Sequence, residues 1–484
     1  MGRHPMRFAL PPRAAVLAAA ALLLACAAPA HAATPFGPLP PHNPYAGPDG
    51  TATMHGDTGS SDATPLPGPP PGPLTSHRVA LQSACPTVLV GSDGYPVALC
   101  TAIFGLTPTV HLLDPADGGS LAELPLAKGS LLGGVYAYLD HQDRLVAVDG
   151  DRNLLRIGHR RDATGRWELY VASRLPLTGA VPAGDAVTGV SPDWQGRVWF
   201  ATGGGVVGTA DDRTGAVRAL ALPTGERIAN SISTAPAGTA VATTHATYLL
   251  TADADGTPRI AWRRAYDRGP GRKPGQLSWG TGSTPTFFGP GTGTDYVTVV
   301  DNAAPTVNLL VHRTSDGSQV CSVPVLKKGG SGSENSPVAV GNTVLVASTY
   351  GYPYPKLPAD AGPAVPSSGR FTGGLSRVDV RADGSGCDLV WDTGVRSAAV
   401  PRLSTADGLI HTVLRRPVIP GTTATSELDP YDYAEVDPAT GAVVRTEYLG
   451  AGFLFDTLQM VGSIAPGGVV YQGTTTGVLR ITAG

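Results

Sequence analysis

Residues 273–324 have the sequence KPGQLSWGTGSTPTFFGPGTGTDYVTVVDNAAPTVNLLVHRTSDGSQVCSVP, and this stretch decides the fold class of the chain. It contains four short runs rich in Val, Thr, Leu and Phe, separated by turns that contain Gly, Pro, Asn and Asp. Such runs are typical of an antiparallel four-stranded sheet. The stretch therefore predicts one complete four-stranded unit, and weaker copies of that unit recur along most of the chain.

Two independent markers count the copies. A turn of the type D-x-x-(T/D)-G, which connects a third strand to a fourth, occurs seven times, as LDPADGGSL, RRDATGRW, ADDRTGAV, ADADGTPRIAW, RTSDGSQV, VRADGSGC and VDPATGAV. A small residue or Pro that opens the first strand gives eight copies, if LGGVYAYLD is included. The spacing of roughly 40 to 65 residues suits four-stranded propeller blades. We predict an all-β fold, an eight-bladed β-propeller of four-stranded antiparallel blades; seven blades is the alternative if residues 131–173 share strands with a neighbour.

The two ends of the repeat array suggest how the ring closes. The chain ends in YQGTTTGVLRITAG, a third strand with no fourth strand after it. The segment HRVAL, residues 77–81, is expected to supply that strand, and ring closure removes exposed sheet edges. The propeller is therefore expected to span residues 77–484.

The segment before the propeller has a different composition. Residues 33–76 are rich in Pro, Gly, Ser and Thr, and this composition predicts a disordered linker because it buries too little apolar surface to become ordered. His42, His55 and Asp57 lie in this segment, and no metal-binding role is expected for them.

The first 32 residues have the pattern of a secretory signal peptide. Arg3, Arg7 and Arg13 precede or flank the apolar run AAVLAAAALLLACAAPA, and Ala30-His31-Ala32 follows it. We expect cleavage near Ala32 and a secreted, extracytoplasmic protein. A transmembrane helix is not expected, since the apolar run is shorter than the ~20 residues that span a bilayer; lipid attachment through Cys26 is the alternative.

Four cysteines remain after the predicted cleavage. An even number of cysteines in an exported protein favours disulfides over metal thiolates. Cys85 and Cys100 are expected to pair because they fall on neighbouring strands of one sheet, and Cys321 is then left to pair with Cys387. The net charge is −3, with 35 Lys and Arg against 38 Asp and Glu. No nucleic-acid partner is expected from this balance, and we expect a monomer.

Several segments resemble a known group of proteins. RKPGQLSWGTGSTPTFFG, YVTVVDNA, SENSPVAVG and ASTYGYPYP are similar to segments of secreted, quinoprotein-like (PQQ-like) β-propellers of bacteria, in particular an exported actinobacterial group. The resemblance covers roughly residues 80–484, implies the propeller fold and carries over no catalytic residue. Relatives that bind pyrroloquinoline quinone (PQQ) use adjacent cysteines, a stacked Trp and a Glu/Asn/Asp set that holds Ca²⁺. This chain has no Cys-Cys pair, so PQQ is not expected as its cofactor.

The propeller geometry predicts where a site would lie. The first strand of each blade starts, and the second strand ends, on one face around the central channel. Residues at these positions share a funnel, which is the predicted ligand site. They are Trp279, Thr284, Glu334, Asn335, Arg396, Arg402 and Gln459 from first-strand starts, and His245, Asp301, Asn302, Tyr350, Tyr352, Arg415 and Arg416 from second-strand ends.

A calcium site is one hypothesis for this funnel. Asp301, Asn302, Glu334 and Asn335 come from consecutive blades, and converging oxygen ligands suit Ca²⁺. The ion would polarise a lactone or ester carbonyl, with His245 or a second carboxylate as general base. The alternative is that these are turn residues whose side chains satisfy local backbone groups.

An acidic saccharide is a second hypothesis for the ligand. The run STYGYPYP, residues 348–355, opens an insertion that reaches to about Gly373, and aromatic residues on a rim stack on sugar rings. Arginines pair with carboxylates, and a lyase would use one of them to neutralise a uronate. The alternative is a rigid loop in which Tyr packs on Pro. The predicted ligand-binding residues are Trp279, Thr284, Tyr350, Tyr352, Arg396 and Arg415, and the predicted catalytic residues are His245, Glu334 and Arg402.

Three functions therefore compete at this point. The leading hypothesis is an exported propeller that binds a small molecule or saccharide in its central funnel, with a Ca²⁺-assisted hydrolase or lyase activity. The second is a non-enzymatic interaction scaffold, and the third is a PQQ-dependent dehydrogenase.

Overall fold

The computed structural model describes residues 1–2, 36–129 and 136–484. The fold lies within residues 34–484. The predicted signal peptide and its Cys26 lie outside the described residues. Among the described residues, no helix combines the length and the apolar character that a membrane crossing requires.

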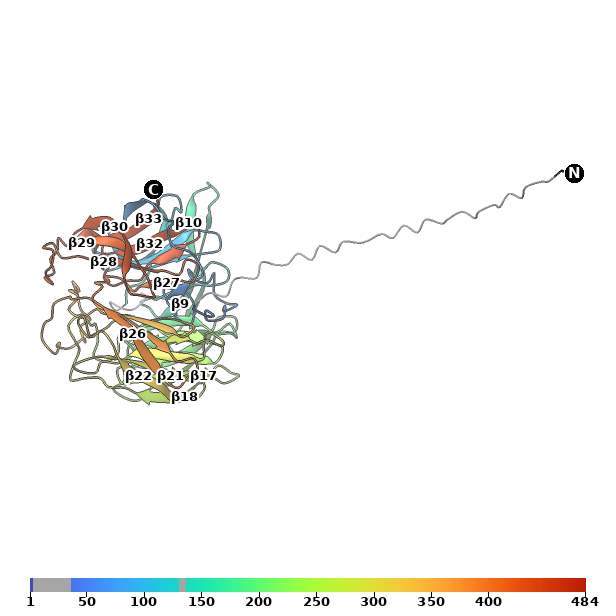
Figure 1. Ribbon diagram of the computed structural model, residues 1–484. Coiled ribbons are helices and arrows are strands. Elements are labelled where there is room, and N and C mark those ends of the chain that lie inside the picture. The colour runs from blue at the N-terminus through green and yellow to red at the C-terminus, as the bar shows by residue number, and fades with distance from the viewer. Residues whose placement is uncertain (3–35, 130–135) are drawn as a thin grey trace. The chain divides into compact units, whose positions relative to one another are not determined.

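In the described part of the chain, the strands form eight antiparallel sheets, each a blade of a β-propeller (Figure 1). The predicted eight-bladed fold is confirmed. The blades, in ring order, are β3 (Ser83–Val90), β4 (Pro96–Ala102), β5 (Pro108–Leu113), β6 (Ser120–Pro125); β7 (Tyr138–Leu139), β8 (Leu145–Val148), β9 (Asn153–Arg161), β10 (Trp167–Pro176); β11 (Val187–Pro192), β12 (Val198–Thr202), β13 (Val206–Asp211), β14 (Ala216–Ala221); β15 (Ser233–Ala235), β16 (Gly238–Ala242), β17 (Ala246–Ala252), β18 (Pro258–Ala265); β19 (Thr286–Phe288), β20 (Tyr296–Val300), β21 (Asn308–Arg313), β22 (Gln319–Pro324); β23 (Val338–Val340), β24 (Thr343–Ala347), β25 (Leu375–Val380), β26 (Cys387–Thr393); β27 (Arg402–Ser404), β28 (Ile410–Arg415), β29 (Pro430–Val436), β30 (Val443–Ala451); and β31 (Ser463–Ala465), β32 (Val469–Thr474), β33 (Gly477–Ala483), β2 (Leu74–Ala80).

The last blade closes the ring as predicted. Strand β2 pairs antiparallel with β33, from Leu74 opposite Ala483 to Ala80 opposite Gly477. The first and last parts of the propeller are therefore joined by a full ladder of backbone hydrogen bonds, and this pairing covers the edge that β33 would otherwise expose.

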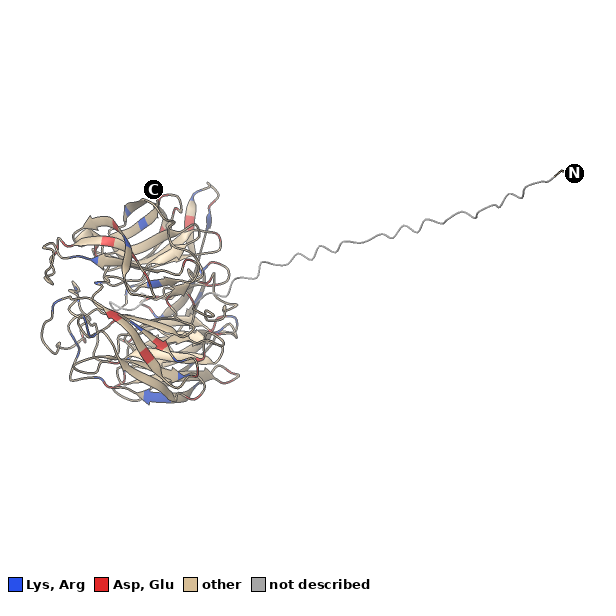
Figure 2. Cartoon of the chain, viewed as in Figure 1, with Lys and Arg blue, Asp and Glu red and all other residues tan. Residues whose placement is uncertain are grey.

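The hydrophobic core lies between neighbouring blades. Second strands such as β20 and β24 are fully buried, whereas fourth strands such as β22 and β26 consist of exposed and partly buried residues. Between the fifth and sixth blades, Phe288, Val311 and Val344 belong to one buried cluster. β-branched and aromatic residues favour such pleated, buried surfaces, which is why the Val- and Phe-rich runs of residues 273–324 form a complete blade. Basic and acidic residues are interspersed over the blades (Figure 2).

Both predicted disulfides are present. Cys85 and Cys100 join β3 to β4 within the first blade, and Cys321 and Cys387 join β22 to β26 across two neighbouring blades. Disulfides of this kind are consistent with an extracellular location, where they persist. Export itself stays a prediction.

Residues 36–66, which we call the plug, do not form the predicted disordered linker. The chain packs Phe36 and Leu39 against the core between the sixth and seventh blades, and most residues from Ala46 to Thr64 are buried. Strand β1 (Ala63–Thr64) adds to the seventh blade in parallel with β27. The prediction of disorder is wrong for this part of the segment.

The plug is ordered through its backbone. Its carbonyl oxygens accept hydrogen bonds from backbone N–H groups of the first strand in six blades, at N–O distances of 2.7–3.1 Å. The donors are Val90, Leu139, Thr234, Phe287, Ala339 and Leu403, and the acceptors, in the same order, are Thr51, Ala52, Thr58, Gly59, Ser61 and Asp62. Buried N–H groups need partners, so the plug satisfies donors that the channel side of each first strand would otherwise leave free. The composition of residues 36–66 cannot predict that the plug is ordered, because its order depends on the backbone N–H groups of the blades.

Candidate functional site

A cavity of about 440 Å³, which we call the funnel cavity, lies on the face where first strands start and second strands end. Its walls include Thr284 and Glu334 before first strands and Thr101 in a second strand, and the plug contributes Met54 and His55. The remaining lining is largely apolar. Cavities of this size, with an apolar lining and a few polar groups, are typical of small-molecule sites.

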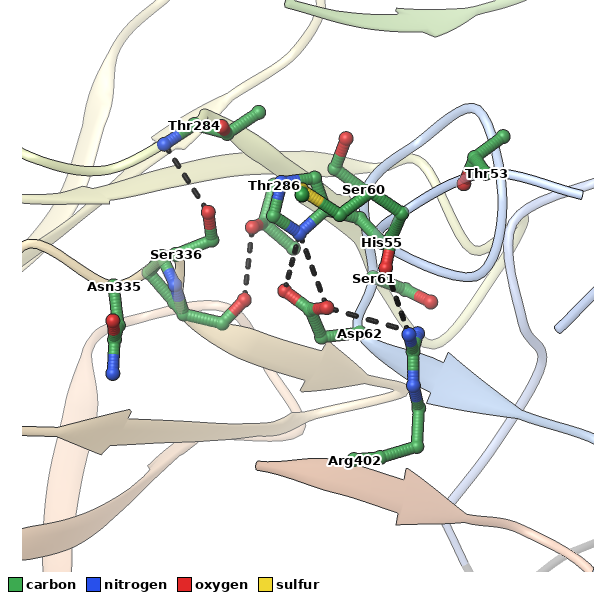
Figure 3. A network of polar contacts seen from close by, with 12 residues as sticks. Thr53, His55, Ser60, Ser61, Asp62, Thr284, Thr286, Asn335, Ser336 and Arg402 are labelled. Carbon is green, nitrogen blue, oxygen red and sulfur yellow. Dashed lines mark hydrogen bonds and ion pairs between the residues drawn. The ribbon is translucent and has the colours of Figure 1, made fainter. Parts of the chain in front are cut away.

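His55 is held at the cavity by a buried carboxylate of the plug itself (Figure 3). Its Nδ1 lies 2.9 Å from Asp62 Oδ2 and 3.1 Å from Asp62 Oδ1. A carboxylate only accepts hydrogen bonds, so Nδ1 carries a proton, and in the neutral imidazole Nε2 then has the free lone pair. That Nε2 is buried and has no protein partner. The imidazole is therefore a base whose reactive nitrogen is left for a ligand.

Arg402 of β27 stabilises the pair of His55 and Asp62 through contacts with the plug. Its Nη1 lies 3.6 Å from Asp62 Oδ1, and its Nη2 donates a 2.8 Å hydrogen bond to the backbone oxygen of Met54. Both Arg402 and Asp62 are fully buried. Arg402, predicted as a catalytic residue that neutralises a substrate carboxylate, instead pairs with a carboxylate of the protein, because the plug brings Asp62 to it.

Glu334 is the carboxyl group of the cavity wall. Its Oε2 accepts a 3.0 Å hydrogen bond from the backbone N–H of Leu277, whereas its Oε1 is buried without a partner. Burial raises the pKa of Glu334 to about 7, and the Leu277 N–H, the Asn230 side chain and the charge of Arg272 only partly oppose this shift. The protonated form is therefore well populated near neutral pH, and it supplies a donor as well as an acceptor.

Tyr136 connects these two groups. Its ring stacks on the imidazole of His55, with centroids 6.3 Å apart and an angle of 24° between the planes. Its hydroxyl lies 3.4 Å from Asn230 Oδ1, and burial together with the charge of Glu334 raises the pKa of Tyr136. It stays neutral at ordinary pH and presents an apolar ring beside two titratable groups.

The structure places four of the sequence-predicted residues at the cavity and the others elsewhere. The four are Thr284, Glu334, Asn335 and Gln459. Thr284 donates its backbone N–H to Ser336 Oγ at 3.2 Å, and Asn335 donates its side-chain amide to Gln459 at 3.1 Å. Both contacts position the wall, and among these four residues Glu334 is the one with a buried side-chain atom that has no partner, Oε1.

Trp279 and His245 lie beside the cavity, around Arg268. Trp279 lines a neighbouring groove of about 570 Å³, and its ring centroid lies 4.2 Å from the Arg268 guanidinium. His245 does not line the funnel cavity. Its Nε2 accepts a 2.7 Å hydrogen bond from Arg268 Nη1, and burial together with that charge lowers its pKa. Because its free nitrogen is already paired, His245 is not available as the predicted general base.

Tyr352 and Arg415 belong to a buried ion-pair cluster outside the cavity. Arg415 pairs with Asp429 at 2.8 Å and Asp456 at 3.2 Å, and the Tyr352 hydroxyl donates to Asp456. Two further predicted ligand residues pack against the loop insertion: Arg396 over Phe371 and Tyr350 against Gly369. The predicted saccharide-binding set is therefore not assembled, because its members are used in packing.

The predicted calcium ligands do not form a common set of free oxygens. Asp301 uses both carboxylate oxygens locally: Oδ1 accepts from the backbone N–H groups of Ala303 and Asn308, and Oδ2 accepts from the Asn308 side chain. Asp301 and Asn302 are absent from the lining that contains Glu334 and Asn335. Among the described side chains, no group of three or more His, Cys, Asp or Glu is placed to hold a metal ion. We derive no step through calcium.

The adjacent cysteines and the stacked Trp with which related propellers bind PQQ have no counterpart at the funnel cavity among the described residues. In the described chain, each of Cys85, Cys100, Cys321 and Cys387 is paired with a cysteine at least 15 positions away, and Trp279 lies outside the funnel cavity. The expectation that PQQ is not the cofactor stays a prediction, and no step is derived through a quinone.

His55, Asp62 and Tyr136 are the residues that the sequence analysis missed. His55 and Asp62 lie in the run HGDTGSSD, residues 55–62, where a histidine and two aspartates stand among Gly, Ser and Thr. That concentration of polar groups in an otherwise Pro-rich segment was the available signal. The composition of the whole segment nevertheless predicts disorder, and a disordered segment has no fixed site.

Comparisons with known proteins support the fold. No protein-family model matches the chain, and no curated protein matches it. Among solved structures, the quinohemoprotein alcohol dehydrogenase from Comamonas testosteroni is similar with a TM-score of 0.54 and 11% identity, over 90% of this chain and 80% of that chain. A europium-containing methanol dehydrogenase is similar with a TM-score of 0.52 and 12% identity, over 90% of this chain and 98% of that chain.

At such low identity the likeness shows the fold alone. The expected similarity to quinoprotein-like propellers is confirmed at that level. The narrower resemblance to an exported actinobacterial group stays a prediction.

Proposed function

We propose that this protein binds a small organic molecule in the funnel cavity. One observation carries the proposal: a largely apolar cavity of about 440 Å³ in which His55 Nε2 and Glu334 Oε1 are buried without partners. An unsatisfied buried polar group costs about 1–3 kcal/mol. A ligand with an apolar body and polar groups that hydrogen-bond to these two atoms would offset that cost, and its apolar body would replace water along the walls.

The lining favours an apolar molecule over a saccharide. Sugars expose many hydroxyl groups, and burying them without hydrogen bonds is costly, whereas the polar atoms of this cavity are few. The Trp279 groove is the better place for a sugar, since this indole is 42% exposed and lies next to Arg268. Of the two predicted ligand classes, we therefore propose a small molecule, and not a saccharide, for the funnel cavity.

Binding of 8-anilinonaphthalene-1-sulfonate, a dye with an apolar ring system and one sulfonate group, tests the proposal. We expect saturable fluorescence with the folded protein and at least a tenfold loss of affinity in Met460→Trp, because the indole would occupy the space that Met460 borders. Val418→Trp, at an exposed position away from the lining, is the matched control and keeps the affinity. Equal affinities in the two variants would place the dye elsewhere and contradict the proposal.

A non-enzymatic interaction scaffold is the second candidate function. Phe104 is 83% exposed at the tip of the loop between β4 and β5, next to Ile103 and Leu106, which line the cavity mouth. Exposed apolar residues at a rim mark interaction sites. Phe104→Ser separates the two functions: a scaffold loses a co-purifying protein partner, whereas a small-molecule site retains its affinity for the dye.

A further inference from the structure

We propose that the funnel cavity is a proton-transfer site, in which His55 acts as the base and Glu334 as the acid on a neutral, largely apolar molecule that carries an activated C–H bond. The inference rests on the proposed function, since it assigns chemistry to the ligand of the same cavity. It concerns residues of the plug and of the sixth blade, which face this space from different segments.

The contacts of His55 define it as a base and fix its direction. Asp62 accepts the Nδ1 proton, so Nε2 is the nitrogen that can receive a proton from a ligand. The Asp62 carboxylate also stabilises the imidazolium that forms, as an orienting carboxylate does for catalytic histidines in general. Asp62 touches His55 and not the ligand, so it is a positioning residue.

The plug holds this pair without freedom to rearrange. The Asp62 N–H donates to the His55 carbonyl oxygen at 2.9 Å, and the Asp62 carbonyl accepts from the Leu403 N–H at 3.1 Å. The stacked Tyr136 ring covers one face of the imidazole. A pre-organised base of this kind pays little reorganisation cost during a reaction.

Glu334, which precedes the first strand of the sixth blade, is the acid that acts together with His55. Its Oε1 is unpartnered and nine-tenths buried, and its other oxygen is anchored by the Leu277 N–H. The other titratable side chains around the cavity are Tyr136, Tyr354 and Lys356, with Arg272 close enough to act on Glu334 electrostatically. Burial raises the pKa of both tyrosines, so a carboxylic acid is the strongest proton donor of the set.

The step needs no co-reactant. His55 Nε2 takes the proton from carbon, the C–H electron pair forms a new π bond, and the bond to a leaving oxygen breaks. Glu334 donates its proton to that oxygen, and the two residues are reset by exchange with water. An elimination has this balance. The apolar lining favours it, because a base that is not hydrated is a stronger base toward a C–H bond.

The elimination of 5-nitrobenzisoxazole tests the inference, since the reaction consists of abstraction of one C–H proton, formation of a nitrile and cleavage of the N–O bond to give a coloured phenolate. We expect the wild-type protein to accelerate it, and His55→Gln to lower the rate by about 10²-fold, the usual contribution of a general base. Glu334→Gln and Asp62→Asn are expected to give smaller losses. His42→Gln, at an exposed histidine of the plug, is the control and keeps the rate.

Two further readouts keep the outcome decisive. In His55→Ala, added imidazole is expected to restore part of the rate, and the pH dependence of the wild-type rate is expected to lose one ionisation in His55→Gln. Dye binding with a wild-type rate no higher than that of His55→Gln would overturn this inference alone. Loss of dye binding by the folded wild-type protein would overturn the proposed function as well.

Discussion

Two stretches of this chain have similar compositions and opposite structural roles. The plug, residues 36–66, and the loop insertion between β24 and β25, residues 350–373, are both rich in Pro and Gly. Most of the plug from residue 46 onward is buried, whereas most residues from Pro353 to Arg370 are exposed. Composition therefore predicts neither role, and the difference lies in what each segment faces.

The plug faces the first strands of the blades, and the insertion faces solvent. The first strands carry N–H groups that point to the channel, and six of them bind plug carbonyls. The ends of the insertion are buried, at Tyr352 and Phe371, whereas its largely exposed middle is held by contacts such as the ion pair between Arg227 and Asp360 and the bridge between Arg272 and Ala364. A segment without its own apolar core becomes ordered when it satisfies buried backbone groups of others.

Removal of the plug is expected to have the largest effect. Replacement of residues 46–64 by a Gly-Ser linker leaves six N–H donors of the first strands without protein partners, at about 1–3 kcal/mol each where water does not replace them. That loss is comparable to the whole stability of a typical domain. We expect loss of cooperative thermal unfolding in calorimetry. The same replacement of residues 356–369 is the control, with a change of about 1 kcal/mol or less; equal effects of the two replacements would contradict the comparison.

Loss of the charge beneath the plug is expected to have the next largest effect. Arg402→Met removes the buried partner of Asp62, and breaking a buried ion pair in this way costs about 3–5 kcal/mol. Chemical denaturation with urea measures the change. Arg381→Met removes one partner of an exposed ion pair with Asp388, for which about 0–1 kcal/mol is expected. A loss below 1 kcal/mol in Arg402→Met would show that Asp62 does not need this charge.

The pH dependence of stability tests the burial of Glu334. Because burial raises the pKa of Glu334 from 4.5 to about 7, the folded state binds its proton more tightly than the unfolded state. This contribution favours folding fully below pH 4.5 and is lost as pH rises through 7. Glu334→Gln removes it, so the stability of the variant relative to wild type is expected to rise by on the order of 3 kcal/mol between pH 4.5 and pH 8.

Urea denaturation at several pH values measures this difference between the two proteins. The matched control is Glu427→Gln, which removes an exposed carboxylate from the loop between β28 and β29. A flat difference for Glu334→Gln over the same pH range would show that Glu334 is solvated, and with it that the cavity is open to water.

The smallest effect is expected at the insertion. Arg227→Ala removes the ion pair with Asp360, and an exposed pair contributes about 0–1 kcal/mol to stability. Lys356 and Pro358 of the same loop line both the funnel cavity and the Trp279 groove. We therefore expect faster association of the dye in stopped-flow fluorescence with unchanged stability. An unchanged association rate would show that the loop does not limit access to the cavity.

The fold was predictable from the sequence because its signals are local. The D-x-x-(T/D)-G turns, the Val-rich runs and the unpaired last strand each report on their own neighbourhood, and together they give eight blades, the closure by β2 and the pairing of Cys85 with Cys100. The second disulfide, between Cys321 and Cys387, followed by elimination.

The candidate site was predictable only in part because it depends on non-local contacts. The funnel face and Glu334 follow from the position of each residue within its blade. His55 and Asp62 reach the cavity only because the plug enters the channel, which the composition of residues 33–76 does not reveal. Arg402 and Arg415 lie near the expected places, but their partners Asp62 and Asp456 are distant in sequence, so their pairing within the protein was not foreseen.

Hydrogen–deuterium exchange with mass spectrometry of the intact protein tests the central claim most directly, because it follows both Pro- and Gly-rich segments in one experiment. Peptides from residues 46–64 are expected to exchange as slowly as those from β19 to β21, since most of these residues are buried and several of their N–H groups are hydrogen-bonded within the protein. Peptides from residues 355–370 are expected to exchange within the earliest time points. Exchange of residues 46–64 at the rate of an unstructured peptide would contradict the claim that the plug is ordered within the channel, and with it the position of His55 in the funnel cavity.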